Sequence, residues 1–129
     1  MIGSVADAAL MGLPDVAYRK DGDAEEPLLC SVCLRPASNM HHAVMKGAGG
    51  VSEVVDRRIP RVALCGSGNL DGCHGDAHRR KLHFDWRNGG WRYLRTDCPT
   101  RRDDALEMGG WMRLPGWEMA LMDRERGME

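Results

Sequence analysis

The sequence predicts an α+β domain with a small metal-binding centre, followed by a β-hairpin and a C-terminal helix. Paired cysteines and histidines fall between residues 30 and 78, apolar and polar residues alternate over 82–96, and a helical apolar pattern covers 116–127. A chain of 129 residues suffices for one domain with one modest core. Because aromatic residues make up only 5% and glycines number 16, we expect a bound metal to add stability.

The N-terminal region is predicted to contain a short helix over residues 4–13, with Ser4 as its N-cap and Pro14 ending it. The polar stretch 19–27 is expected to be a linker. The predicted organisation is therefore an N-terminal helix and acidic linker over 1–27, a core over 28–81, and an extension over 82–129.

The core is expected to consist of short elements. Residues 39–45 are predicted to be extended, and the glycine-rich stretch 46–50 is predicted to be a loop. The apolar run 61–65 is a candidate strand, and residues 73–81 are typical of a helix.

The extension gives the clearest secondary-structure signal in the chain. Apolar residues alternate on both sides of an "RNGG" turn, which is the pattern of a β-hairpin. We expect these apolar side chains to pack in the core: Leu82, Phe84, Trp86, Trp91 and Tyr93. His83 lies between them and is expected at the polar surface.

The last predicted element is an amphipathic helix over residues 116–127. Its expected apolar contacts are Trp117, Ala120 and Leu121, and we assign it no chemical role.

Four cysteines in two pairs predict a structural zinc site. Cys30 and Cys33 form a CxxC motif, whose two thiolates can chelate one ion through a tight turn. Cys65 and Cys73 are separated by "GSGNLDG", a flexible stretch that can bring both sulfurs to one centre. A redox pair at Cys30 and Cys33 is the alternative, but it leaves the other two cysteines unexplained. Cys98 is left over and is expected to be an ordinary small residue in a turn.

The histidines predict a second metal site. His74 and His78 are four residues apart, so a helix places both on one face. His41 and His42 are adjacent, so an extended segment points them in opposite directions. One of these two can join His74 and His78 on a divalent cation while the other faces a substrate. A cation and a neutral imidazole base are sufficient for phosphodiester hydrolysis, whereas unconnected surface histidines are the alternative interpretation.

The charge distribution suggests a polyanionic partner. Residues 57–102 contain eleven basic and four acidic side chains, although the whole chain has a net charge of −1. A solvated charged surface is the alternative. The N-terminus has no basic region of a signal peptide, and no apolar run reaches the roughly 20 residues needed to cross a bilayer, so we expect a cytoplasmic protein with reduced thiols and no membrane partner.

Residues 28–80 resemble the zinc-containing HNH endonucleases. The matching strings are "CSVC", "NMHHAVMKGAGG" and "RVALCGSGNLDGCHGDAH", and the long loop between the second pair of cysteines is similar to HNH proteins of bacteriophages. The resemblance implies a ββα-metal (HNH) core stapled by four zinc-binding thiolates. It also implies that His42 is the general base and that the catalytic divalent cation is held by His41, His74 and His78.

One position departs from the HNH pattern. The family usually has an asparagine just before the strand that ends in cysteine, whereas this chain has Ile59 and Pro60 there. That asparagine steadies the loop carrying the general base, so its absence puts the efficiency of catalysis in doubt. Asn69 and Asp56 are candidate substitutes, although neither matches the position.

The function that the resemblance implies is metal-dependent hydrolysis of DNA phosphodiester bonds, with nicking as one mode. Its cofactors would be structural Zn2+ and a catalytic divalent cation such as Mg2+, Mn2+, Ni2+ or Zn2+. Its partners would be DNA and phage packaging or recombination proteins. A non-catalytic, zinc-stabilised nucleic-acid-binding module with a degenerate HNH fold is the second hypothesis.

Basic residues on both sides of the predicted site are expected to contact DNA phosphates. Such contacts give salt-dependent affinity without base specificity. The residues are Arg57, Arg58, Arg61, Arg79, Arg80 and Lys81. Hairpin arginines could extend this phosphate track, namely Arg87, Arg92 and Arg95.

Overall fold

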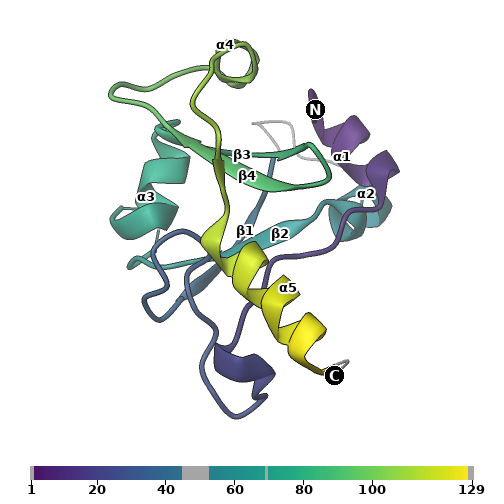
Figure 1. The fold of residues 1–129 in the computed structure, drawn as a ribbon. Helices are drawn as coiled ribbons and strands as arrows, with labels where there is room; N and C mark the ends of the chain where they lie inside the picture. Colours follow the sequence, from purple (N-terminus) through teal and green to yellow (C-terminus); the bar gives the residue numbers. More distant parts are fainter. Residues whose placement is uncertain (1, 45–52, 69, 128–129) are drawn as a thin grey trace.

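The computed structural model describes residues 2–44, 53–68 and 70–127 and shows a mixed α/β fold with two small antiparallel sheets (Figure 1). One sheet pairs β1 with β2, and the other has the order β3-β4-β5. The strands are β1 (Asn39–His42), β2 (Arg61–Leu64), β3 (Leu82–Arg87), β4 (Gly90–Arg95) and β5 (Met112–Arg113).

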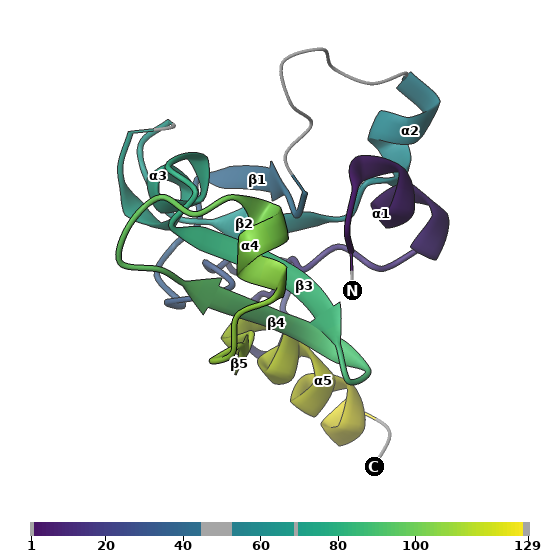
Figure 2. The same ribbon diagram turned by 90° about the horizontal axis from the view of Figure 1, so that it is seen from above.

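The helices surround these sheets. The β3–β4 hairpin lies between α4 and α5, and α2 and α3 lie on opposite sides of the β1–β2 pair in both views (Figures 1 and 2). The helices are α1 (Val5–Met11), the 3-10 helix η1 (Lys20–Gly22), α2 (Glu53–Arg58), α3 (Gly72–His78), α4 (Arg102–Leu106) and α5 (Pro115–Gly127).

The N-terminal helix is confirmed, with a different end. The Ser4 side chain accepts a hydrogen bond from the Asp7 amide, as expected for the N-cap. The helix ends at Gly12, whose φ of 61° is left-handed, before Pro14 is reached. The stretch 19–27, expected to be a linker, contains η1 and is closed by a bridge between Arg19 and Leu28.

The core elements are confirmed, although α3 is shorter than predicted. Strand β1 pairs with β2 so that His41 lies opposite Val62 and His42 opposite Arg61. Helix α3 ends at His78, because Arg80 has a φ of 62° and takes the chain out of the helix. The predicted loop at 46–50 lies outside the described residues.

The hairpin is confirmed with its turn at Asn88 and Gly89. Both residues have positive φ, 54° and 76°, as a two-residue type I′ turn requires. Phe84 and Trp91 are fully buried, and Trp86 and Tyr93 pack against the same cluster, so the expected core role of the hairpin aromatics is also confirmed.

The opposite face of β3 is buried too, contrary to the expectation that His83 lies at the surface. Helix α4 and the N-terminal segment cover this face, so His83 and Asp85 are both buried. Asp85 accepts a hydrogen bond from the Ile2 amide at 2.6 Å and one from Arg87 Nε at 2.7 Å. Arg102 Nη2 lies 3.8 Å from the same carboxylate and donates to the Phe84 carbonyl.

A hydrophobic cluster joins all three predicted segments. It includes Ile2 from 1–27, Leu64 from 28–81, and Phe84, Trp91 and Trp117 from 82–129. The predicted C-terminal helix is confirmed as α5, which buries Trp117 and packs Leu121 against the cluster. In the described part of the chain, no helix is both long and apolar enough to span a membrane.

The buried carboxylate of Asp85 predicts a large stability effect. Asp85→Ala removes the acceptor of the Ile2 amide and of Arg87 Nε and the negative charge beside Arg102, so we expect the free energy of unfolding to fall by about 3–5 kcal/mol. Chemical denaturation measures this loss. Asp104→Ala, at an exposed position of α4, is the matched control and should change stability by about 0.5 kcal/mol or less. Equal losses in the two variants would contradict the role given to Asp85.

Candidate metal centres

The first cysteine pair lies in a tight turn over residues 30–34. The Leu34 amide donates to the Cys30 carbonyl, and Leu34 has a φ of 63°, which reverses the chain directly after Cys33. This turn, the cysteine turn, is held against β2 because the Ser31 amide donates to the Ala63 carbonyl at 2.8 Å. It positions the Cys30 and Cys33 sulfurs side by side.

The second pair depends on two glycines in close contact. Gly66 and Gly72 have φ values of 127° and 62° and bracket the loop between Cys65 and Cys73. A Cβ on Gly72 would lie 2.6 Å from the Gly66 Cα and 2.7 Å from the Cys65 carbonyl oxygen. This close crossing lets a long loop return Cys73, at the start of α3, to Cys65 at the end of β2.

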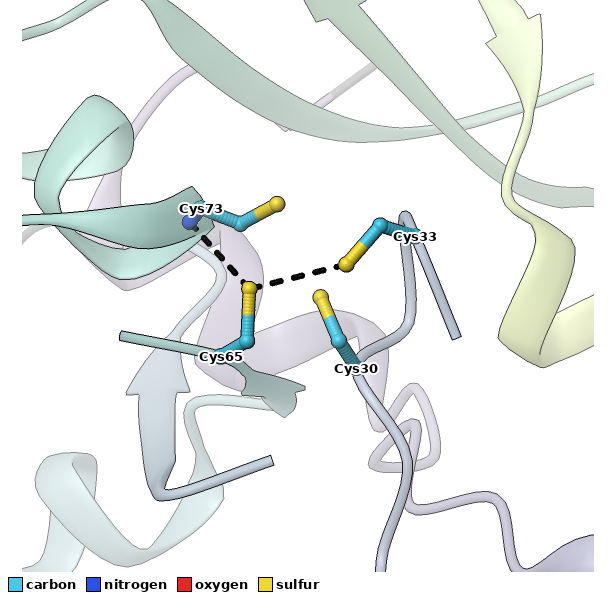
Figure 3. Close-up of side chains that lie close together, drawn as sticks. All are labelled: Cys30, Cys33, Cys65 and Cys73. Carbon is cyan, nitrogen blue, oxygen red and sulfur yellow. Dashed lines mark hydrogen bonds between the residues drawn. The ribbon is translucent and has the colours of Figure 1, made fainter. Parts of the chain in front are cut away.

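The four sulfur atoms converge on one point (Figure 3). All lie within 4.8 Å of one another, and Cys33 Sγ is 3.5 Å from Cys65 Sγ. Zinc–sulfur bonds of about 2.3 Å in a tetrahedral site place the sulfurs about 3.8 Å apart, so the donor set fits such an ion. The sulfur separation is too long for a disulfide, and all four cysteines are free.

The electrostatics of the group favour a bound cation. The pKa of the Cys30 thiol is lowered to about 4, chiefly because the Cys73 side chain hydrogen-bonds to it. The same interaction raises the pKa of Cys73, and burial raises the pKa of Cys33. Without a cation, one thiolate therefore suppresses ionisation of its neighbours, and a divalent ion removes that repulsion.

Arg95 of β4 contacts the same group. Its Nη2 donates to Cys73 Sγ at 3.1 Å and its Nη1 to Asp76 at 2.8 Å. The guanidinium places a positive charge next to the sulfurs and ties the hairpin to α3. The guanidinium of Arg95, although exposed, is thus engaged with groups of the protein, which argues against its place on a phosphate track. Arg87 is engaged likewise, with Asp85 and the Leu106 carbonyl.

Three of the predicted histidines form a second group. His41 of β1 and His74 and His78 of α3 have ring centroids 4.6–5.1 Å apart, and their ligating nitrogens lie within 4.8 Å of one another. His74 Nε2 and His78 Nε2 are 3.1 Å apart. We call this group the histidine cluster.

The orientation of His74 is fixed by its other ring nitrogen. Nδ1 lies 2.6 Å from the Gly68 carbonyl oxygen, which can only accept, so Nδ1 carries the proton. Nε2 then presents its lone pair to the centre of the cluster. A backbone carbonyl that orients a ligating imidazole in this way is a common feature of metal sites.

His41 and His78 are held in the neutral form that binds metals. Burial lowers the pKa of His41 to about 3, and repulsion from His74 and His78 adds to the effect. Burial and the neighbouring His74 also lower the pKa of His78. Neutral imidazoles keep a free lone pair at physiological pH, so the three nitrogens suit a divalent cation.

His42 is the adjacent residue on β1 and is not part of the group of three. Successive side chains on a strand point to opposite faces, so His41 turns to α3 while His42 turns the other way. Ile59 and Pro60, which stand where the HNH resemblance would place an asparagine, are both buried, and the Pro60 carbonyl accepts from the Ala43 amide. Asn69 and the side chain of Asp56 lie outside what the structure describes.

The predicted phosphate-binding residues occupy two separate regions. Arg57 and Arg58 end α2, whereas Arg79, Arg80 and Lys81 follow α3 on the other side of β1–β2 (Figure 2). All five except half-buried Lys81 are exposed.

Two of these arginines are partly neutralised by nearby acids. Arg61 forms an ion pair with Asp15 at 3.7 Å and lies opposite His42 in the sheet. Arg79 pairs with Asp76 at 3.5 Å and also donates to the Leu70 carbonyl.

Several residues at these centres could not be found from the sequence. Arg95 reaches Cys73 from the hairpin, and Gly68 reaches His74 from the cysteine loop. His83 is buried and its Nε2 lies 2.9 Å from the Arg80 carbonyl oxygen, which orients the residue just past α3. None of these contacts follows a spacing rule.

No protein family, curated protein or solved structure matches this chain significantly.

The close contact between Gly66 and Gly72 predicts that adding a single methyl group at Gly72 causes loss of the bound metal. Gly72→Ala inserts a Cβ within 2.6 Å of backbone and should separate Cys65 from Cys73, so metal is lost. Gly68→Ala is the matched control, because Gly68 has the same φ of 62° but no atom within 4 Å of its Cβ. Elemental analysis after gel filtration should find about one structural ion per chain in wild type and the control, and less in Gly72→Ala. Equal metal content in both variants would contradict the role given to the contact between Gly66 and Gly72.

The lowered pKa of His41 predicts a pH effect on stability. The unfolded state takes up a proton near the ordinary pKa of 6.5, whereas the folded state does so only near 3. Stability should therefore fall as the pH drops from about 6.5 towards 3.

His41→Gln removes this contribution. Between pH 7 and pH 5, without added divalent cation, wild type should lose up to about 2 kcal/mol more than the variant in urea titrations. A loss of equal size in both proteins would show that His41 is not held neutral by burial.

Proposed function

We propose that this protein is a metal-dependent DNA endonuclease of the HNH type that hydrolyses phosphodiester bonds. The observation that carries the proposal is the histidine cluster, because β1 and α3 bring three imidazoles within 4.8 Å of one another beside a four-cysteine group. A redox protein using Cys30 and Cys33 would need neither the second cysteine pair nor the histidines.

We propose zinc as the ion of the four-cysteine group. Four thiolates in tetrahedral reach are the donor set that zinc prefers in structural sites. This site keeps no position for a substrate, because all four donors come from the protein. It therefore contributes to folding and leaves catalysis to the histidines.

The catalytic roles are divided between two faces of β1. His41, with His74 and His78, would hold a divalent cation, which supplies positive charge to the scissile phosphate and to the leaving oxygen. His42 would take the proton from the attacking water, a role that suits an imidazole near neutral pH. Exposed arginines on the two sides of β1–β2 would hold the phosphates that flank the cleavage point.

A non-catalytic, zinc-stabilised nucleic-acid-binding module is the second candidate. The observation that favours it is the presence of buried Ile59 and Pro60 where HNH enzymes usually carry an asparagine. Such a module would keep the four-cysteine group and the basic surface and lose the cutting chemistry.

Plasmid nicking distinguishes the two candidates. We expect the wild-type protein to convert supercoiled plasmid to the open circle with Mg2+, Mn2+, Ni2+ or Zn2+. His42→Ala should slow cleavage by about 100-fold or more, because a positioned general base contributes a factor of that order. The variant should keep its fold and its structural ion.

Met40→Ala, on the same strand and half-exposed, serves as the matched control and should cut like wild type. Cleavage by His42→Ala at the wild-type rate would remove His42 from the mechanism. DNA that is retarded on a gel but remains uncut with every cation would instead identify the binding module.

A further inference from the structure

A cavity of about 610 Å³ adjoins the histidine cluster. Its volume lies in the range of about 300–1,000 Å³ that is typical of sites for small ligands. His41 forms part of its wall, so the cavity and the candidate cation site share one side chain. The cavity reaches from β1 and the end of α3 to the start of β3 and of α4.

The cavity combines an apolar interior with a positively charged edge. Its buried apolar walls come from Ala43, Val44, Ala77, Leu82 and Phe84. Three arginines and one acid also line it, namely Arg80, Arg101, Arg102 and Asp103. A ligand that fits must be flat or compact, largely apolar, and attached to negative charge.

The three arginines are not equivalent. Arg102 is committed to the fold, because it donates to the Ile2 and Phe84 carbonyls at 2.9 Å. Among the described residues, the exposed side chains of Arg80 and Arg101 make no hydrogen bond or ion pair. Their guanidinium groups are therefore available for an anionic ligand.

The backbone of Arg80 is strained. Its φ of 62° is unfavourable for a residue with a side chain, and its carbonyl accepts from the Thr100 amide, His83 Nε2 and Thr96 Oγ1. These three contacts hold an arginine at a position where glycine would be relaxed. A strained residue that lines a cavity beside a candidate site suggests a functional reason for its side chain.

We propose that this cavity holds an unpaired nucleobase of the DNA strand being cut, next to the phosphate at the histidine cluster. The proposal rests on the proposed nuclease function and deepens it: the preferred substrate is DNA with an unpaired nucleotide at the cleavage point. A base has an apolar face for the walls and polar edges for Asp103, and the phosphates on either side of it pair with Arg80 and Arg101. A base stacked in a duplex enters less readily, because it must first unpair and unstack from its neighbours.

The test measures binding separately from cleavage. Fluorescence anisotropy with the full zinc-loaded chain, without added catalytic cation, compares three probes: a single-stranded DNA oligonucleotide, the same strand in a duplex, and the strand with abasic positions in place of its bases. The abasic strand keeps every phosphate. We expect the single strand to bind at least about tenfold more tightly than either other probe, because the stacking of even one base on a protein surface can contribute a factor of that order.

Two variants each remove one of the exposed arginines that line the cavity. Arg101→Ala should lose at least about tenfold in affinity for the single strand. Arg80→Gly should lose affinity likewise while its Tm stays equal to wild type or rises, because glycine relaxes the φ of 62°. Arg113→Ala, an exposed arginine of β5 outside the cavity, and Asn88→Gly, at another positive φ, are the controls and should bind like wild type.

The binding results decide whether the cavity holds a base, independently of whether the protein cuts DNA. Equal binding of abasic and ordinary strands, or unchanged binding by Arg101→Ala and Arg80→Gly, overturns the base pocket even if plasmid is cut. Base-dependent binding that both variants lose supports the pocket even if no cation supports cleavage. A protein that cuts fully paired duplex as fast as the same duplex with one unpaired nucleotide overturns the proposed substrate preference.

Discussion

The convergence of four cysteine sulfurs is the constraint on which most of the fold depends. The cysteine turn contacts β2 through Ser31, and the Ser31 carbonyl accepts from the Gly116 amide at the start of α5. A Cβ on Gly116 would lie 2.8 Å from the Ser31 Cα, so α5 sits directly on the turn. The cysteine group thereby connects a strand and two helices in a chain whose apolar core is small.

The positions of the clustered histidines depend on the same strands and helix that position the cysteines. Strand β1 supplies His41 because it is paired with β2, and β2 ends directly before Cys65. Helix α3, whose second residue is Cys73, supplies His74 and His78. The alternation of side chains along β1 then points His41 and His42 to opposite faces of the strand. The metal-ligand role that we propose for His41 and the general-base role that we propose for His42 are compatible on one short strand for this reason.

Features that depend on residues close in the sequence could be predicted, whereas contacts between distant segments could not. The CxxC turn, the i, i+4 histidines and the Asn-Gly hairpin each depend on neighbours in sequence, and all three are found as predicted. His83 is buried and not at the surface as expected. The alternation of apolar and polar residues predicts which face of β3 a side chain occupies, but it cannot show that α4 covers that face. The contact of Arg95 with Cys73 and the cavity beside Arg101 likewise join segments that no local pattern relates.

Cys73 and His74 are consecutive residues that belong to different groups, each of which could hold a metal ion. An ion at the cysteines fixes the first turn of α3, and the imidazoles one residue and one turn later are then already in place for a second ion. Occupancy should thus be hierarchical, with the sulfur site filled first and the nitrogen site gaining affinity from it, and linkage makes the gain reciprocal. If each group binds an ion, a shortage of the ion at the cysteines would weaken binding at the histidines even while the second ion is plentiful.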